Sequence, residues 1–462
     1  MGERQTPIMA ALHKLTGGVQ VRLCMPGHKG DTGFFGGEML RCDITELPGA
    51  DNLLCPDGAI AESEALHAAY VGADAAFFTT NGSTAGNLAM LSLFRGKKVI
   101  FPRGVHLSAA NAISLFAISP VFLDSVPCDY PAVVSAEDVR AALKLHRDAA
   151  AVFITYPNYF GLCCDLATIA AVAHRAGAAL IVDAAHAAHF AYSPLLPAYP
   201  AQAGADIWVE SAHKTLPAMN QCACVCVGKN SLADKAMVRQ ALSLVQTTSP
   251  SYVLLCSMDY AYAYMRDKGE EELSRIVRLA EKLADAISAI PGCTCPGISG
   301  VAARDSLKIV ADVSGTGYTG IAMQEALAAQ GVHVEAADLK NLLLLLTVGD
   351  TASQLDIFRR ALAQMPHIRG KSLYFSPYSL PAFTKYSQSS WFWGNIESVR
   401  IERSVGMISA STAGVYPPGE AVLLRGQQIS YEIAGYLLEA RRQGFSLFGV
   451  EGDSIRIYRE RI

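Results

Sequence analysis

The sequence has no apolar run long enough to cross a membrane and no pair of cysteines spaced as Cys-x-x-Cys. A membrane-spanning helix needs about 20 mostly apolar residues without breakers, whereas proline, histidine or asparagine interrupts the longest uncharged stretches, 149–164 and 184–205. Zinc sites with four tetrahedral ligands usually contain Cys-x-x-Cys or a histidine counterpart. We therefore expect neither a membrane protein nor a structural zinc protein.

Charge is also scarce, with 17% charged residues against 51% hydrophobic ones. This composition is far from that of disordered chains. The 38 Lys and Arg residues against 42 Asp and Glu residues give a net charge of −4, and no basic run is present that could neutralise a series of phosphates. The N-terminus shows no apolar segment followed by a cleavage site. We expect a cytoplasmic protein with a small-molecule substrate and no nucleic-acid or membrane partner.

Three of the 12 cysteines, Cys222, Cys224 and Cys226, lie two residues apart. On a strand such residues share one face. We interpret them as small buried residues in a reducing compartment, in preference to metal ligands.

Short apolar runs alternate with helix-like segments from residue 75 onward. The apolar runs lie at 75–80, 98–102, 120–123, 151–155, 179–183, 206–211 and 222–228. Strands that alternate with helices of this length form right-handed βαβ crossovers. The pattern predicts an α/β protein whose central sheet is mostly parallel and flanked by helices.

The later part of the chain has a different pattern. Long helical patterns near 231–246, 249–266 and 269–289 end at Pro291-Gly292, and a mixture of strand and helix patterns follows, with a loop at 370–390. We predict an N-terminal arm at 1–40, a large domain at 41–298 and a small α+β domain at 299–462. Such an arm usually docks on its own or a partner subunit.

Polar residues follow several of the predicted strands, where ligands bind in open parallel sheets. These residues are Asn81-Gly82-Ser83-Thr84, His106, Asp183 with His186, and Ser211-Ala212-His213-Lys214. In the first group, glycine permits a sharp turn, and the two hydroxyl residues stand at the positive end of the next helix. The group predicts a phosphate site, although an ordinary helix cap by Ser83 or Thr84 fits equally well.

Asp183 ends a strand that should be buried, where a carboxylate needs a cationic or strongly donating partner. A protonated pyridine nitrogen is one such partner, although position alone favours a cap of the next helix. Lys214 follows 31 residues later and could form a Schiff base with an aldehyde, although alone it would be a surface lysine. A phosphate site, an aspartate and a lysine at one sheet edge together predict pyridoxal phosphate.

Histidines near the same edge suit this cofactor. An imidazole at His106 could lie on the pyridine ring, or be a buried and satisfied core histidine. His186 is close enough in sequence to steer the Asp183 carboxylate or to approach the ring hydroxyl. We expect His189 to serve packing.

Several motifs resemble those of the Orn/Lys/Arg decarboxylases in their short form, most of all the bacterial arginine decarboxylases. The motifs are MPGHKG at 25–30, DITELPGADNLLCPDGAI at 43–60, FFTTNGSTAGNLAML at 77–91, TYPNYFG at 155–161, VDAAHAAHF at 182–190, SAHKTL at 211–216, VEAADLKNLLLLLTVGD at 334–350 and YPPGEAV at 416–422. The resemblance implies the pyridoxal-phosphate-dependent fold of aspartate aminotransferase, with the cofactor in the large domain. It also implies a homodimer or higher homo-oligomer, with the arm and the 43–60 loop at the interface.

The resemblance also implies a role for each matching residue. Lys214 would form the Schiff base, Asp183 would pair with the pyridine nitrogen and His106 would stack on the ring. The remaining cofactor-binding residues would be Gly82, Ser83, Thr84, Ser211 and His213 around the phosphate, with His186 nearby. The implied reaction converts a basic amino acid to its amine and CO₂ for polyamine synthesis, with arginine favoured and lysine or ornithine possible.

The chain departs from the family pattern mainly among residues expected near the substrate. The departures are Ala184, Ala187, Asn52, Cys55 and Ser411. Because a cationic substrate needs a carboxylate partner, they leave the identity of the amino acid open. The remaining acidic candidates for binding its far end are Asp51, Asp57 and Glu335.

The proton donor and the reaction type also remain open. Lys214 or His213 could protonate the substrate carbon. An aminotransferase or lyase is the first alternative, but Arg400, Arg403 and Arg425 show no recognisable carboxylate-binding motif. A non-catalytic relative is the second, and the presence of Lys214 and Asp183 argues against it.

Overall fold

A computed structural model describes residues 5–17, 22–33, 37, 39–123, 133–298, 300–368, 380–387, 395–416 and 419–459. The chain divides into two compact units. Unit 1 comprises Met1–Leu93 and Leu166–Ser274, and unit 2 comprises Phe94–Asp165 and Arg275–Ile462. The loop expected at 370–390 lies largely outside the described residues, and the domain boundaries near 40 and 298 stay a prediction.

In the described part of unit 1, four strands lie in the order β1 (Ala75–Thr79), β8 (Ala223–Val227), β7 (Ile207–Glu210) and β6 (Ala179–Asp183). β6 and β7 are parallel, whereas β8 runs antiparallel to both β1 and β7. Every residue of β6, β7 and β8 is buried. Burial on both faces explains why these strands read as continuous apolar runs in the sequence.

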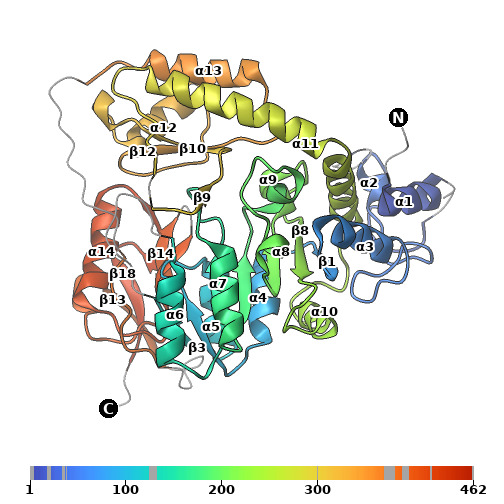
Figure 1. The fold of residues 1–462 in the computed structure, drawn as a ribbon, viewed down its shortest axis with the longest axis horizontal. Helices are drawn as coiled ribbons and strands as arrows, with labels where there is room; N and C mark the ends of the chain where they lie inside the picture. The colour runs from blue at the N-terminus through green and yellow to red at the C-terminus, as the bar shows by residue number, and fades with distance from the viewer. Residues whose placement is uncertain are drawn as a thin grey trace. The chain divides into compact units, whose positions relative to one another are not determined.

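The helices of unit 1 pack on its strands or on one another. They are α1 (Pro7–Gly17), α2 (Met39–Cys42), α3 (Ala59–Val71), α4 (Gly82–Ser92), α7 (Leu166–Arg175), α8 (Pro200–Ala203), α9 (Ala212–Thr215), α10 (Lys235–Ser243) and the first part of α11 (Tyr252–Ser288). α3 packs on β1 (Figure 1). α4 approaches the sheet so closely that a Cβ atom at Gly86 would lie 2.4 Å from Val209 Cγ2.

In unit 2, β4 (Ala149–Thr155), β2 (Lys98–Phe101) and β3 (Ser119–Phe122) follow one another in that order. All three are parallel. α5 (Leu107–Leu115) and α6 (Ala136–Leu145) connect them, and β5 (Leu162–Cys163) pairs with β9 (Ala303–Arg304). Ser135 and Asp138 form a capping box at the start of α6, which fixes the helix start.

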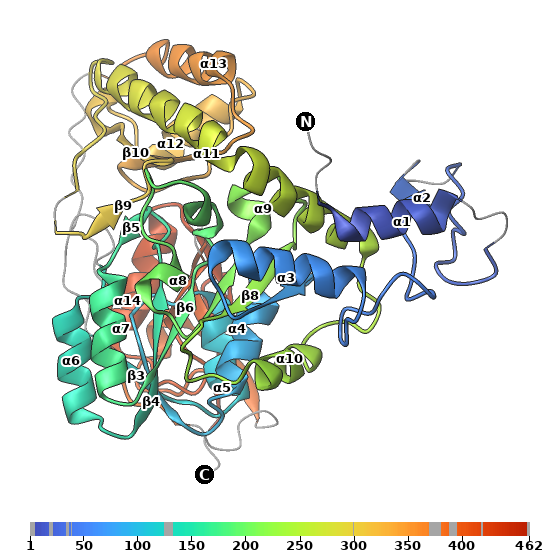
Figure 2. The same cartoon turned by 45° about the vertical axis from the view of Figure 1, so that its right-hand side comes forward.

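The residues of unit 2 that the structure describes also form three small antiparallel sheets. They are β10 (Lys308–Asp312), β12 (Asn341–Leu345) and β11 (Ala336–Ala337); β13 (Ile396–Arg400), β18 (Ser454–Tyr458) and β17 (Val450–Glu451); and β15 (Glu420–Leu423), β14 (Ala413–Tyr416) and β16 (Ser446–Phe448). The accompanying helices are α12 (Gly320–Ala328), α13 (Ala352–Ala363) and α14 (Tyr431–Arg442). α13 lies alongside the second half of α11 in both ribbon views (Figures 1 and 2).

The predicted α/β class is confirmed, and the predicted strand at 179–183 has the bounds of β6. The two helical patterns at 249–266 and 269–289 form one continuous helix, α11. The intervening Gly269 remains helical because it packs closely: a Cβ atom there would lie 2.9 Å from Tyr192 Cβ.

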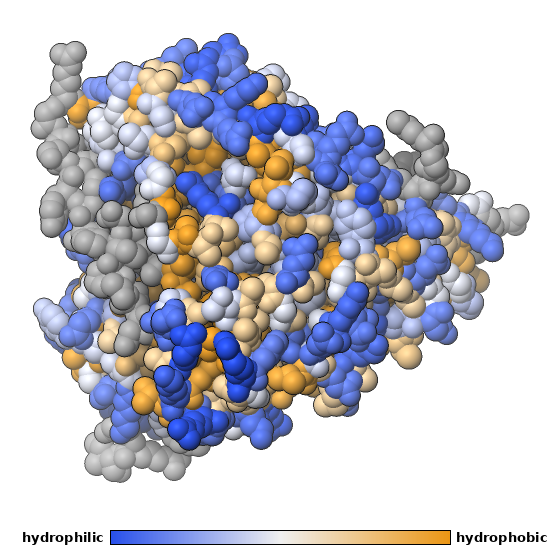
Figure 3. Space-filling view, viewed as in Figure 1, coloured by the Kyte–Doolittle hydropathy of each residue, from blue (hydrophilic) through white to orange (hydrophobic). Residues whose placement is uncertain are grey.

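No helix in the described part of the chain is both long and apolar enough to span a membrane. On the face drawn in Figure 3, hydrophilic and hydrophobic residues are interspersed over the described regions.

Candidate active site

Lys214 and His186 meet in unit 1 although 28 residues separate them. Lys214 lies in α9, just beyond β7, and His186 lies three residues beyond the end of β6. Because these strands are parallel neighbours, their carboxyl ends lie side by side. The Nζ atom of Lys214 lies 3.2 Å from Nε2 of the buried His186. This contact permits a proton to pass between an amine and an imidazole.

Asp183, the last residue of β6, is 4% exposed. Its Oδ2 accepts a hydrogen bond from Asn87 Nδ2 at 2.8 Å, and its Oδ1 accepts one from the backbone N–H of Ala185 at 3.2 Å. The second bond closes a turn directly after β6. Asp183 is not the cap of the next helical segment, which begins only at Ala188. Asn87 was not singled out by the sequence analysis, because only the packing of α4 on the sheet brings it to Asp183.

The predicted phosphate site lies at the start of α4, which begins at Gly82. Gly82 has φ +69°, and a Cβ atom there would meet nothing within 4 Å. The N-cap is Asn81, whose side chain makes no capping bond, so the alternative of a cap by Ser83 or Thr84 is wrong. Space is therefore open beside Gly82 at the helix start, although the Gly82 N–H itself donates to the backbone oxygen of Gln221 at 2.8 Å.

Two further polar residues precede or lie in α9. Ser211 is fully buried, and its Oγ has no hydrogen-bond partner within the described part of the chain. His213 Nδ1 donates to the backbone oxygen of Cys222 at 2.8 Å, so the neutral ring has its lone pair on Nε2. Burial, together with the charge of Lys214, lowers the pKa of His213. A buried hydroxyl without a partner costs free energy that a bound acceptor would recover.

This donor set fits pyridoxal phosphate. The open helix start and the unpartnered Ser211 hydroxyl suit a phosphate. The buried Asp183 carboxylate suits a protonated ring nitrogen, and Lys214 suits an aldehyde. All of these groups belong to unit 1.

His106 belongs to unit 2, where it is the N-cap of α5. Its Nδ1 accepts a hydrogen bond from the backbone N–H of Ser108 at 3.2 Å and lies 2.8 Å from Ser108 Oγ. Nε2 therefore carries the proton in the neutral ring. The stacking role stays a prediction. His189, in contrast, is 1% exposed beside Phe190, which confirms its predicted packing role.

Asp51 is occupied by its own loop. Its carboxylate accepts hydrogen bonds from the backbone N–H groups of Asn52, Asp57, Gly58, Ile60 and Ala61. Partial burial opposes ionisation, but these bonds prevail and lower the pKa of Asp51. The set of bonds secures the entry to α3 and leaves little capacity for a substrate. Asp57 is exposed and donates its N–H to this same carboxylate.

Glu335, in unit 2, accepts a hydrogen bond from Tyr159 Oη at 2.7 Å. Burial raises the pKa of Tyr159, and so does the Glu335 charge, which keeps the phenol a donor. The buried Lys308 lies under this phenol: Nζ donates to the Tyr159 backbone oxygen at 2.7 Å and lies 5.1 Å from the ring centroid. Tyr159 is thus held between Glu335 and Lys308.

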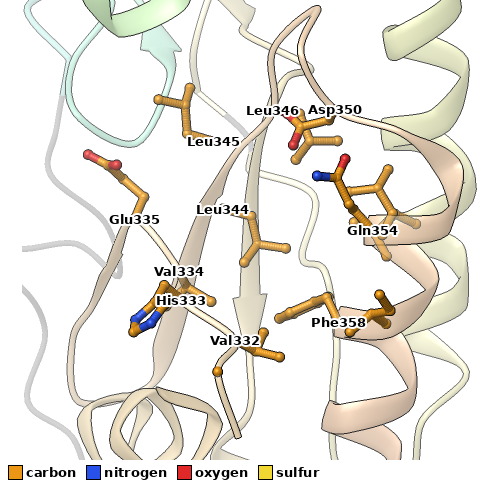
Figure 4. A pocket seen from close by; sticks show the side chains of 14 residues that line it. Val332, His333, Val334, Glu335, Leu344, Leu345, Leu346, Asp350, Gln354 and Phe358 are labelled. Carbon is orange, nitrogen blue, oxygen red and sulfur yellow. The ribbon is translucent and has the colours of Figure 1, made fainter. Parts of the chain in front are cut away.

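Glu335 also lines a pocket of about 570 Å³ in unit 2 (Figure 4). Leu344, Leu346 and Phe358 supply apolar walls, while Asp350 and Gln354 supply polar groups. A carboxylate at the margin of an apolar pocket suits a ligand with an aliphatic stem and a cationic head.

Comparison with known proteins gives a consistent family. Residues 6–302 match the family model described as Orn/Lys/Arg decarboxylase, major domain. The arginine decarboxylase of Halalkalibacterium halodurans is 30% identical over 481 residues, which cover 99% of this chain and 98% of that protein. The arginine decarboxylase of Bacillus subtilis is 29% identical, with the same coverage.

Solved structures share the fold at lower identity. The lysine decarboxylase LdcF of Francisella novicida superimposes with a TM-score of 0.83 at 16% identity, covering 98% of this chain and 81% of that chain. Lysine decarboxylase A of Pseudomonas aeruginosa gives a TM-score of 0.81 at 20% identity, covering 98% and 80%. These likenesses support the α/β fold.

Proposed function

The chain belongs to the Orn/Lys/Arg decarboxylase family, and from this premise we propose that it decarboxylates a basic amino acid, with arginine as the favoured substrate. It is a pyridoxal-phosphate-dependent amino-acid decarboxylase that releases CO₂ and the corresponding amine. Arginine is favoured because full-length relatives about 30% identical bear the name arginine decarboxylase. The observation that carries the proposal is Lys214 beside His186, in the same unit as a buried Asp183.

We assign the cofactor contacts as the sequence predicts them. Lys214 attaches the cofactor covalently, Asp183 pairs with the ring nitrogen and His106 stacks on the ring. The phosphate contacts are assigned to Gly82, Ser83, Thr84, Ser211 and His213. When bound, pyridoxal phosphate supplies an electron-accepting ring for the electron pair that the departing CO₂ leaves behind.

The protein's residues must also return a proton to the substrate's α-carbon. His213 suits this role poorly, because its only N–H in the neutral ring is held by Cys222 and its lowered pKa disfavours a second proton. Lys214 carries transferable protons, and His186 Nε2 at 3.2 Å can take one from it or return one. We therefore assign Lys214 as the proton donor and His186 as its partner.

We assign recognition of the cationic end of the substrate to Glu335. A guanidinium group pairs well with a carboxylate, and the bond from Tyr159 to Oε1 orients this carboxylate. Asp51 is not carried forward, because its carboxylate already accepts five backbone hydrogen bonds.

We also propose that the protein works as a homodimer or higher homo-oligomer in the cytoplasm and that its product enters polyamine synthesis. These statements rest on the family resemblance and composition of the sequence. Enzymes of this fold generally assemble as symmetric oligomers.

The experiment has two steps. First, the protein loaded with pyridoxal phosphate is reduced with borohydride and digested, and mass spectrometry locates the modified lysine. Second, arginine, lysine, ornithine and uncharged amino acids are screened for CO₂ and for amine or keto-acid products. Lys214→Ala is the test variant, and Lys229→Ala, at an exposed lysine after β8, is the matched control.

We expect modification at Lys214 and CO₂ release from one basic amino acid, both lost in Lys214→Ala and kept in Lys229→Ala. A keto acid without CO₂ would favour an aminotransferase. Failure of any lysine to bind the cofactor would favour a non-catalytic relative.

A further inference from the structure

A second group of chemically capable residues lies in unit 1, apart from those assigned above. It consists of His67 on α3 and Cys224 and Cys226 on β8, all fully buried. One ligand atom from each lies within 4.8 Å of the other two. We propose that these three residues bind a thiophilic divalent metal ion, with Zn²⁺ as the first candidate.

The spacing of the sulfur atoms fits such an ion. Cys224 and Cys226 lie two residues apart on one strand, so their side chains share a face. Their Sγ atoms are 3.7 Å apart. Two thiolates bound to Zn²⁺ at about 2.3 Å with a tetrahedral angle lie about 3.8 Å apart. The strand thus presents both sulfurs at the required separation.

His67 supplies a second, independent observation. Its Nε2 lies 3.0 Å from Glu210 Oε1, and because a carboxylate only accepts, Nε2 carries the proton. Nδ1 is then a buried lone-pair donor beside the Cys224 thiol, and in the described part of the chain no donor meets it with full hydrogen-bond geometry. A metal ion would satisfy this nitrogen, whose burial alone costs free energy.

The surroundings of His67 match those of metal-binding histidines. Such a histidine commonly donates its other ring N–H to a carboxylate, which fixes the ring and its tautomer. Glu210 is that carboxylate here, and it is the cross-strand neighbour of Cys224. Tyr262 donates to Glu210 Oε1 at 3.0 Å and Tyr199 donates to Oε2 at 2.5 Å. These bonds fix the Glu210 carboxylate, which in turn fixes the His67 ring.

Charge balance selects the class of ion. Two thiolates, a neutral imidazole and the Glu210 carboxylate bonded to it give a charge of −3, which a divalent ion reduces to −1. A monovalent ion would leave −2 in a fully buried site, which is more unfavourable. Sulfur and imidazole ligands favour zinc-like ions over Mg²⁺ or Ca²⁺, which prefer oxygen. The three residues fill three of the four tetrahedral positions of Zn²⁺. Because none of them is exposed, the ion would join α3 to β8.

The test measures metal content directly and does not depend on the decarboxylase activity. The full chain is loaded with pyridoxal phosphate, produced with added zinc, dialysed against EDTA and analysed by inductively coupled plasma mass spectrometry. We expect about one zinc per wild-type chain and a loss of at least tenfold in the Cys224→Ser/Cys226→Ser variant. Cys293→Ser, at a buried cysteine outside the cluster, is the matched control and should keep its zinc.

A second measurement on the wild type covers the case in which the double variant fails to fold. Zinc-edge X-ray absorption should show two sulfur ligands per ion. Zinc below a tenth of an equivalent, or bound zinc without sulfur ligands, overturns the proposal.

Discussion

Replacement of Glu64 by glutamine should change how the stability of the protein depends on pH. Glu64 lies on α3 and is 3% exposed. Its Oε2 accepts a hydrogen bond from Arg239 at 2.5 Å, and its Oε1 accepts one from the backbone N–H of Phe78 at 2.8 Å. Burial outweighs the attraction of Arg239 and raises the pKa of Glu64 to about 7.

The sign of the effect follows from this rise. A carboxyl group whose pKa is higher in the folded than in the unfolded chain favours folding most when it is protonated. The contribution of Glu64 to the free energy of unfolding is therefore fully present below its usual pKa of 4.5 and is lost as the pH rises through 7. A rise from 4.5 to about 7 corresponds to about 3 kcal/mol of unfolding free energy.

The assay is urea unfolding followed by intrinsic fluorescence at a series of pH values between 4.5 and 8. Over this range the wild type should lose about 3 kcal/mol more stability than Glu64→Gln. Glutamine does not titrate, so the variant lacks the change in protonation at residue 64 that gives the wild type this part of its pH dependence. Glu62→Gln, at an exposed position on the same helix, is the control and should follow the wild type. Parallel pH profiles for the wild type and Glu64→Gln would refute the reasoning.

Three further substitutions have defined outcomes. Asn87→Leu removes a donor to the buried Asp183 and should weaken pyridoxal phosphate binding by about tenfold or more, measured by equilibrium dialysis; unchanged affinity would contradict the role of this bond. Tyr159→Phe removes the donor to Glu335 and should raise KM for arginine by roughly 2- to 10-fold in steady-state kinetics without affecting cofactor binding; an unchanged KM would count against Glu335 as the substrate ligand. Gly86→Ala places a methyl group 2.4 Å from a side chain of β7 and should cost about 1–3 kcal/mol in urea unfolding, whereas wild-type stability would show that α4 can move.

The sequence predicts the strands around the site well, because their burial leaves a plain signal. β6 and β7 are buried along their whole length. β6 ends at Asp183, and the short segment after β7 carries Lys214. That order alone predicts a lysine and an aspartate at one sheet edge.

Contacts between distant segments could not be predicted in this way. Asn87 reaches Asp183 through the packing of α4, and His67 reaches Cys224 through the packing of α3. Neither pair has a recognisable spacing. Asp51 shows the same limit, because the motif that made it a candidate substrate ligand does not reveal the backbone hydrogen bonds that its carboxylate accepts.

The most direct test of the proposed decarboxylase activity is release of CO₂ from carboxyl-labelled arginine by the protein loaded with pyridoxal phosphate. We predict CO₂ and the corresponding amine in equal amounts, with loss of both in Lys214→Ala and retention in Lys229→Ala. Labelled CO₂ that persists in Lys214→Ala, or arginine consumed without CO₂, would contradict this prediction.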